Sequence, residues 1–331
     1  MKERYRWIDI AKGIGILLVV VGHATSIYMD KGMYLKSILY RNLYQYIYSF
    51  HMPMFIMISG LLSGRKSIES KRYEIKRNIV AYGIPYIVFS LGWGITKILL
   101  SRFVVHETRV KDLFLIPFYP IVPYWYLYAL LLMNVLQVFV NHNKNDKKFR
   151  YFHLLMALSG YIVCTYVTEM YSWLKGSIIE RFLSLYIFYV IGVYSGDFFL
   201  GIRVEKSKMM KAIIPVMVGS VWFIACKSKE LFAYEVLSLN FSIAILGTVF
   251  VLLLSLSMNN NAFLEYLGRM TLPIYLLHTP SMLVMQTLIK VTGIEDVNGV
   301  ISLLILTFFG VFFSLLIYYV GKKVMILQLA E

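Results

Sequence analysis

The sequence predicts an all-α, polytopic integral membrane protein with about ten transmembrane helices. Of its 331 residues, 59% are hydrophobic and 15% are charged, whereas soluble domains carry about 25% charged residues. Apolar runs of about 20 residues, the length that crosses a hydrocarbon core, recur from one end of the chain to the other. Because no polar stretch is long enough to fold independently, we expect residues 1–331 to form a single membrane-embedded domain.

Charge placement predicts the orientation of this domain. With both termini in the cytoplasm, the inside segments hold 20 Lys and Arg residues and the outside segments hold 11, as the positive-inside rule requires. The net charge of +15 therefore lies in short loops, where topology and anionic lipid explain it and nucleic acid does not. The expected spans are 7–28, 45–64, 78–100, 123–140, 151–168, 182–200, 212–226, 239–257, 270–289 and 299–320.

The first span carries three ionisable groups on one face. Lys12 and His23 are 11 residues apart, so eleven steps of about 100° return them to nearly the same side, about 16 Å apart along the axis. Asp9 lies one turn before Lys12. Ionisable groups inside a membrane segment are costly unless they are paired or hydrated, which predicts a functional site. The alternative is an Asp9–Lys12 ion pair at the membrane edge, with His23 directed outward.

The second span contains a histidine beside a proline. Pro53 has no N–H, so it removes a backbone hydrogen bond and kinks or breaks a helix. A broken helix carrying His51 and Ser59 would line a cavity. The interpretation that the sequence alone favours is simpler: a helix starts here, with Pro53 in its first turn and His51 among the lipid headgroups.

Two further regions combine charge with aromatic residues. The loop 65–77 is the most basic in the chain; it is either a topology anchor or a phosphate-binding patch in which Arg77 presents its planar fork. Trp125 lies in an aromatic cluster at a span entry, typical of interfacial belts and also of carbohydrate-stacking sites. Arg181, at the start of the sixth expected span, is a simple interfacial charge or a ligand contact.

The ninth expected span adds another imidazole. His278 lies well inside an apolar stretch, between Pro273 and Pro280. One intramembrane histidine is satisfied by a backbone carbonyl alone, but two of them, with a third at His51, make this structural interpretation less satisfactory. The histidines lack a short ligand spacing, and Cys164 and Cys226 fall in separate apolar segments. We therefore expect no metal site.

Five stretches together resemble the acyltransferase-3 family of integral membrane O-acyltransferases, particularly its fucose 4-O-acetylase-like members, which modify surface polysaccharides. They occur in the family's order and span residues 8 to 280. The stretches are IDIAKGIGILLVVVGH, FHMPMFIMISG, the basic loop ending at Arg77 before IPY, PYWYL, and FLEYLGRMTLPIYLLH.

The resemblance implies a ten-helix fold that takes an acyl group, usually acetyl, from acyl-CoA at the cytoplasmic face. The acceptor would be a sugar hydroxyl of a cell-surface or lipid-linked polysaccharide. His23 matches the family's first-helix histidine, and Lys12 matches its basic partner. Arg77 matches one residue of a two-arginine pattern, while Ala81 stands where the second arginine is expected. This departure puts the details of CoA binding in doubt, and Lys76 is the neighbouring cation that would compensate.

The chemistry of acyl transfer assigns roles to the remaining candidates. His23 acts as general base or as a transient acyl carrier, two routes that the resemblance does not separate. His278, His51 and Ser59 are candidates to stabilise the oxyanion. Lys12 is too far from His23 to polarise the carbonyl and is expected to contact CoA phosphate or Asp9. The residues expected to contact substrate are Asp9, Ser59, Trp125 and Arg181.

The expected partners are acetyl-CoA as acyl donor, the glycan acceptor, membrane lipid and a second copy of the chain in a homodimer. No metal cofactor is expected. The expected location is the bacterial cytoplasmic membrane, which the chain would cross several times. A proton-coupled transporter or flippase of a glycan or lipid is the alternative function, because intramembrane Asp, Lys and His are equally expected there.

Overall fold

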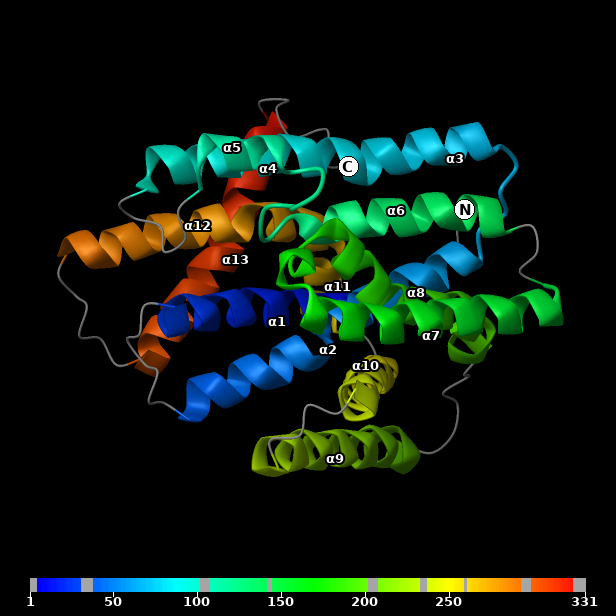
Figure 1. The fold of residues 1–331 in the computed structure, drawn as a ribbon. Coiled ribbons are helices and arrows are strands. Elements are labelled where there is room, and N and C mark those ends of the chain that lie inside the picture. Colours follow the sequence, from blue (N-terminus) through cyan, green and yellow to red (C-terminus); the bar gives the residue numbers. More distant parts are fainter. Residues whose placement is uncertain are drawn as a thin grey trace. The chain divides into compact units, whose positions relative to one another are not determined.

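The protein is helical throughout the part of the chain that the structure describes. The computed structural model describes residues 5–30, 38–101, 108–141, 145–201, 208–232, 237–258, 261–292 and 299–323, and these residues contain no strand. The prediction of an all-α fold is confirmed (Figure 1). The longer helices are α1 (Arg6–Asp30), α2 (Ile38–Gly64), α4 (Ile84–Leu99), α6 (Trp125–Val140), α7 (Lys147–Met170), α8 (Ile178–Gly201), α9 (Lys208–Phe232), α10 (Leu237–Ser257), α12 (Thr271–Thr292) and α13 (Gly299–Lys323). The short ones are α3 (Lys71–Asn78), α5 (Val110–Phe114), α11 (Ala262–Arg269), the π-helical turn η1 (Ile79–Gly83) and the 3₁₀ turn η4 (Ser172–Leu174).

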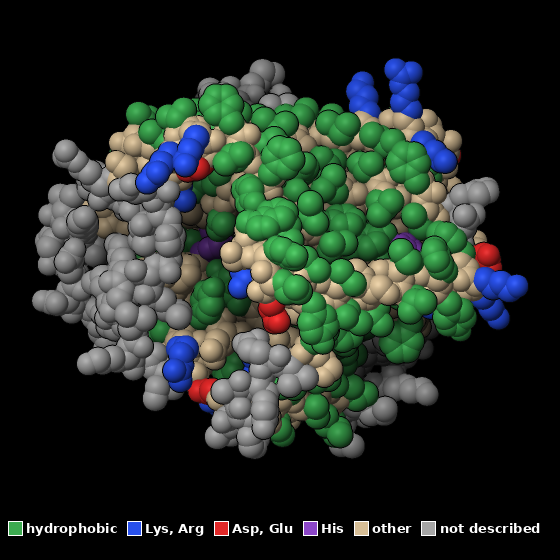
Figure 2. Space-filling model, viewed as in Figure 1, with side chains coloured by type: hydrophobic (Ala, Val, Ile, Leu, Met, Phe, Trp, Pro, Cys, Tyr) green, Lys and Arg blue, Asp and Glu red, His purple; other side chains and the backbone are tan. Residues whose placement is uncertain are grey.

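The length and composition of these helices fit a polytopic membrane protein. Eight helical stretches of the described chain are long and apolar enough to cross a membrane. Figure 2 shows many hydrophobic side chains on the described surface in view. Such an exposed apolar surface is stable in lipid, whereas in water it would drive aggregation.

Two of the expected spans are not among these eight stretches. Expected span 123–140 corresponds to α6, a shorter apolar helix of 16 residues. Expected span 270–289 corresponds to α12, which is long enough but carries His278, Thr279 and Ser281 near its middle. The count of ten spans therefore stays a prediction. The predicted cytoplasmic termini also stay predictions, because residues 1–4 and 324–331 lie outside the described residues.

Helix α2 corrects the expectation that a helix starts near Pro53. The helix begins at Ile38, and Pro53 lies inside it. His51 is only 3% exposed, so it does not lie among headgroups. The proline removes one backbone hydrogen bond, but ending the helix within hydrocarbon would leave several backbone groups without partners. Continuing the helix is therefore the less costly solution.

The third expected span also begins earlier than predicted. Helix α3 starts at Lys71, after Ser70 caps its N-terminus by accepting a hydrogen bond from the Tyr73 N–H. Half of the predicted basic loop is thus helical. The helix then widens into the π-helical turn η1 immediately before Pro85. A proline ring clashes with the carbonyl four residues earlier, and the wider turn accommodates it.

The chain divides into two compact units. The first unit comprises residues 1–51, 99–107 and 204–330, and therefore α1, the first half of α2 and α9 to α13. The second unit comprises residues 52–98 and 108–203, and therefore the second half of α2 and α3 to α8. That all residues form a single domain stays a prediction.

Within the first unit, α1 packs against α10, α11, α12 and α13. Its contact with α11 is a backbone contact: a Cβ on Gly13 would overlap the carbonyl of Leu264, and a Cβ on Gly268 would overlap the carbonyl of Asp9. Small residues allow such close approach of membrane helices. Gly13 in the first expected span therefore serves the packing of α1 against α11.

Within the second unit, α2 and α8 approach through glycines spaced four residues apart on each helix. A Cβ on Gly60 would overlap the Tyr189 carbonyl, and a Cβ on Gly192 would overlap the Met57 carbonyl. Gly64 approaches the backbone of Val193 in the same way. This is the small-xxx-small packing of membrane helices, and α8 also packs against α6 and α7.

We predict that Gly192→Ala destabilises the protein although alanine is the better helix former. The added Cβ meets the Met57 backbone, which cannot move as a side chain can, and overpacking of this kind costs about 1–3 kcal/mol. Thermal unfolding in detergent would measure the loss. Gly92→Ala is the matched control, because a Cβ there meets nothing within 4 Å; equal melting temperatures for the two variants would contradict the packing.

Candidate active site

Three imidazole rings approach one another in the first unit. His23 on α1 lies with its ring centroid 5.0 Å from that of His278 on α12. His51 on α2 joins them through Tyr48, whose ring centroid is 4.8 Å from His51 and 6.3 Å from His23. The structure therefore brings the three histidines, from three different helices, close together. We name these three residues the histidine cluster.

Hydrogen bonds assign the tautomers of two members of the histidine cluster. The Nδ1 of His51 is 2.7 Å from the carbonyl oxygen of Ile47, one turn earlier in α2. The Nδ1 of His278 is 2.8 Å from the Tyr275 carbonyl and 3.1 Å from the Ile274 carbonyl. Because a carbonyl only accepts, each Nδ1 carries the hydrogen and donates it. In the neutral ring the Nε2 atoms of His51 and His278 are then acceptors.

This pattern changes what the two residues can contribute. An acceptor nitrogen does not stabilise an oxyanion, so His51 and His278 would have to be protonated to play that predicted part. The Nε2 of His278 already accepts from the Thr279 hydroxyl at 3.2 Å. Both rings are buried, with 3% exposure for His51 and none for His278. In this arrangement each of the two neutral rings contributes an acceptor nitrogen, Nε2, to the histidine cluster.

His23 differs from the other two histidines. The residue as a whole is half-buried, and its ring nitrogens have no hydrogen-bond partner among the residues that the structure describes. Of the three imidazoles, His23 is thus the one whose nitrogens remain available to a reactant. A neutral imidazole in this position can accept a proton from a hydroxyl group and return it later.

Asp9 and Lys12 lie on α1 on the expected stripe, toward its N-terminal end. Both side chains are half-buried, and each interacts with another group of the protein. The close contact of Gly268 with the Asp9 backbone holds this end of α1 against α11. Lys12 remains about 16 Å from His23 along the helix, so the structure does not bring it to the histidine cluster.

Arg77 and Lys76 lie in the second unit, at the C-terminal end of α3. Arg77 forms an ion pair with Glu74 one turn earlier, and the Glu74 side chain is only 9% exposed. Lys76 is exposed to solvent. The sequence analysis missed Glu74 as a partner, although its spacing of three residues from Arg77 was a signal. Arg77 is thus held in place by a carboxylate before any ligand arrives.

Ser59 also belongs to the second unit. Its hydroxyl donates to the Phe55 carbonyl at 2.9 Å, and the Tyr126 hydroxyl is a second partner. With its hydrogen committed to the helix backbone, Ser59 is a weaker candidate for oxyanion stabilisation than the sequence suggested.

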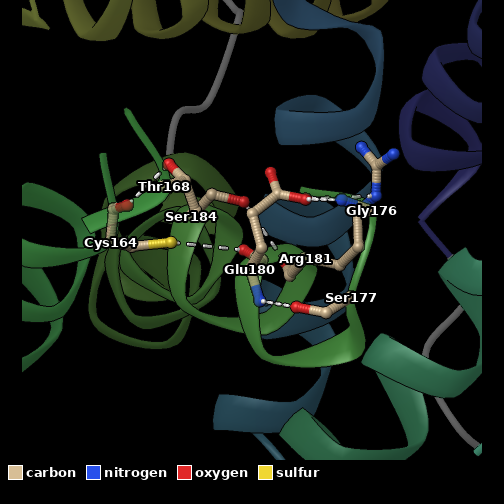
Figure 3. Close-up of polar contacts among 7 residues, drawn as sticks. All are labelled: Cys164, Thr168, Gly176, Ser177, Glu180, Arg181 and Ser184. Atoms are coloured by element: carbon tan, nitrogen blue, oxygen red, sulfur yellow. Dashed lines mark hydrogen bonds and ion pairs between the residues drawn. The ribbon is translucent and has the colours of Figure 1, made fainter. Parts of the chain in front are cut away.

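Trp125 and Arg181, both expected to contact substrate, lie together in the second unit. The guanidinium carbon of Arg181 is 4.7 Å from the centroid of the Trp125 ring, a cation–π contact. Figure 3 shows how the start of α8 holds this arginine beside Glu180, whose carboxylate is 3.6 Å from Arg181 Nε and accepts from the Gly176 N–H at 3.2 Å. Ser177 completes the turn by accepting from the Glu180 N–H at 3.2 Å, as in a capping box.

Among the described residues, no group of three His, Cys, Asp or Glu side chains is arranged so that it could hold a metal ion. A metal-free site stays a prediction.

The sequence analysis did not anticipate the contacts of Tyr44 and Tyr48 near His51. These tyrosines precede His51 by seven and three residues, and this helical spacing was the available signal.

A known protein family matches nearly the whole chain. A family model described as an acyltransferase domain matches residues 5–319, a range that includes every candidate residue named above. No curated protein and no solved structure matches the chain.

Proposed function

The chain belongs to the acyltransferase-3 family, and from this premise we propose that it is a membrane O-acetyltransferase. It moves an acetyl group from cytoplasmic acetyl-CoA to a sugar hydroxyl of a cell-surface or lipid-linked polysaccharide. The observation that carries this proposal is the histidine cluster, in which His23 has ring nitrogens open to a reactant while His51 and His278 are bonded to their own helices.

The reaction follows from these groups. The lone pair of a His23 nitrogen takes the proton of the sugar hydroxyl as its oxygen attacks the thioester carbonyl carbon. The new C–O bond forms, the C–S bond breaks, and the CoA thiolate leaves with the proton returned by the imidazolium. General-base catalysis of this kind contributes about 10²–10⁴ in rate.

A second route passes through the histidine itself. Here a His23 nitrogen attacks the thioester carbonyl, CoA leaves as the thiol, and the acyl-imidazole then gives its acetyl group to the sugar hydroxyl. Rapid quenching of labelled protein in a neutral denaturing detergent distinguishes the routes: protein-bound label that neutral hydroxylamine releases, absent in the His23→Ala variant, supports the acyl-histidine.

The donor contacts lie in the second unit. Arg77 binds a CoA phosphate in place of, or beside, its Glu74 partner, and exposed Lys76 supplies additional positive charge. In the first unit, Lys12 is assigned to CoA phosphate or to a pairing within the protein, and Asp9 is assigned to the acceptor. In the second unit, Arg181, Trp125 and, with less support from its hydrogen bonds, Ser59 are assigned to the acceptor.

The setting of the reaction is a multi-pass protein of the bacterial cytoplasmic membrane. Its partners are acetyl-CoA, the glycan and membrane lipid, and a homodimer is compatible with the apolar surface. The competing function is proton-coupled transport of a glycan or lipid, which intramembrane Asp9, Lys12 and His23 would also serve.

We predict that His23→Ala abolishes turnover of acetyl-CoA, with a loss of at least about 100-fold. Purified protein in detergent with radiolabelled acetyl-CoA would release acetate slowly and transfer label to a crude surface-glycan extract. The variant should elute and melt as the parent does.

Thr25→Ala serves as the control on the same helix, since its hydroxyl is bonded to the Val21 carbonyl at 2.8 Å. Undiminished transfer by the His23→Ala variant would refute the catalytic assignment. Absence of any turnover or acetyl-CoA binding by folded parent protein would instead favour the transporter, which requires sealed vesicles and a gradient.

We predict that Arg77→Ala lowers the preference for acetyl-CoA over S-acetyl-pantetheine by about tenfold or more. Removing one charge-assisted phosphate contact costs about 1.5–3 kcal/mol, and the truncated donor carries no phosphate. The measurement is kcat/KM for both donors.

Arg72→Ala is the matched control, because Arg72 lies exposed on the same helix and we assign it no ligand contact. A preference for acetyl-CoA that falls equally in both variants would show general electrostatic attraction and exclude a specific phosphate site at Arg77.

A further inference from the structure

One face of α2 carries a continuous row of side chains that leads to the histidine cluster. Arg41, Tyr44, Tyr48 and His51 follow one another at intervals of three, four and three residues, so they lie on one side of the helix. The charge bias places the Arg41 end of α2 outside the cytoplasm. The row thus runs from the outer end of the helix inward to His51.

The rings in this row are in contact with one another. Tyr44 and Tyr48 are stacked, with centroids 4.0 Å apart and ring planes 24° from parallel. Tyr48 then meets His51 and His23 edge-on, at 74° in both cases. An aromatic path of two tyrosines therefore ends directly at the imidazoles, all within the first unit.

Packing holds Tyr48 in this position. A Cβ placed on Gly22 of α1 would lie 3.0 Å from Cε2 of Tyr48 and 3.2 Å from Ile47, so the glycine is what allows the ring to lie against α1. As residues, Tyr44 and Tyr48 nevertheless remain half-buried and not fully buried. At the outer end, Arg41 is exposed and forms an ion pair with Glu230 at 3.7 Å.

We propose that Tyr44 and Tyr48 form the acceptor subsite of the enzyme, in which the C–H face of a pyranose ring packs against Tyr44 and directs a hydroxyl toward His23. The inference rests on the proposed function and names the residues that receive the sugar. A pyranose ring combines an apolar C–H face with peripheral hydroxyls, and tyrosine combines an apolar ring with a polar tip.

The arrangement distinguishes this subsite from an interfacial aromatic belt. Belt residues anchor separately at the headgroup level, whereas these rings stack on each other along one helix and continue to a group with open nitrogens. Tyr44 lies two helical turns, about 10 Å along the axis, before His51 at a rise of about 1.5 Å per residue, and its ring is joined to that of His23 through Tyr48 by centroid distances of 4.0 Å and 6.3 Å.

The test compares two kinds of acceptor in three proteins: the parent, Tyr44→Ala and Tyr44→Phe. Methyl glycosides of fucose, galactose, glucose and mannose present a pyranose ring without an aromatic aglycone, which would itself stack on tyrosine; glycerol presents hydroxyls without a ring. For Tyr44→Ala we expect kcat/KM for the best methyl glycoside to fall about tenfold relative to that for glycerol. Tyr44→Phe keeps the ring face and should retain most of this preference.

Saturation-transfer NMR with the same methyl glycosides measures binding without turnover. We expect transfer from the parent protein to the C–H protons on one face of the sugar, and its loss in Tyr44→Ala. Tyr166→Ala, which removes a tyrosine that is 59% exposed on α7, is the control for loss of a surface ring.

The outcomes separate this inference from the proposed function. Acetyl-CoA hydrolysis that depends on His23, together with an unchanged preference in Tyr44→Ala, would overturn the subsite while leaving the acetyltransferase intact. Failure of every methyl glycoside to bind or react with an active parent protein would overturn it as well. Absence of His23-dependent hydrolysis in folded parent protein would remove the proposed function itself.

Discussion

Hydrocarbon offers no hydrogen-bond partners, so leaving a polar group of a membrane helix without a partner in the protein is costly. His51 and His278 meet this constraint by donating Nδ1–H to a carbonyl of their own helix, one turn earlier. His23 makes no such bond among the described residues. The difference singles out one imidazole for chemistry, because the other two have their tautomers fixed by the helix backbone.

Glycine determines where that imidazole lies. Gly13 and Gly268 let α1 and α11 meet backbone to backbone, and Gly22 admits the ring of Tyr48 beside His23. In lipid no hydrophobic effect drives helices together, so close van der Waals packing at small residues carries much of the stability. The same positions therefore serve both the fold and the geometry of the histidine cluster.

The two arginines of the second unit that are assigned to a ligand each have a carboxylate neighbour. Glu74 pairs with Arg77, and Glu180 lies beside Arg181, which also stacks on Trp125. Such partners limit the cost of placing an arginine in a low-dielectric setting and orient its fork. An incoming anion must then compete with a carboxylate, which favours groups of higher charge such as phosphates.

The sequence by itself determined the membrane class, most of the helices and the placement of Lys12 and His23 on one face. These features depend on amino-acid composition and on the helical repeat of about 3.6 residues per turn, and both can be read from the residues of one segment alone. Only the tertiary structure decided that α2 continues through Pro53, that His51 is buried with His23 and His278 rather than among headgroups, and that Tyr48 connects them. Glu74 as the partner of Arg77 and the contact of Trp125 with Arg181 were likewise not foreseen. The burial and pairing of a side chain depend on which faces of separate helices meet. Packing between segments distant in the sequence decides this, and the periodicity of a single segment does not reveal it.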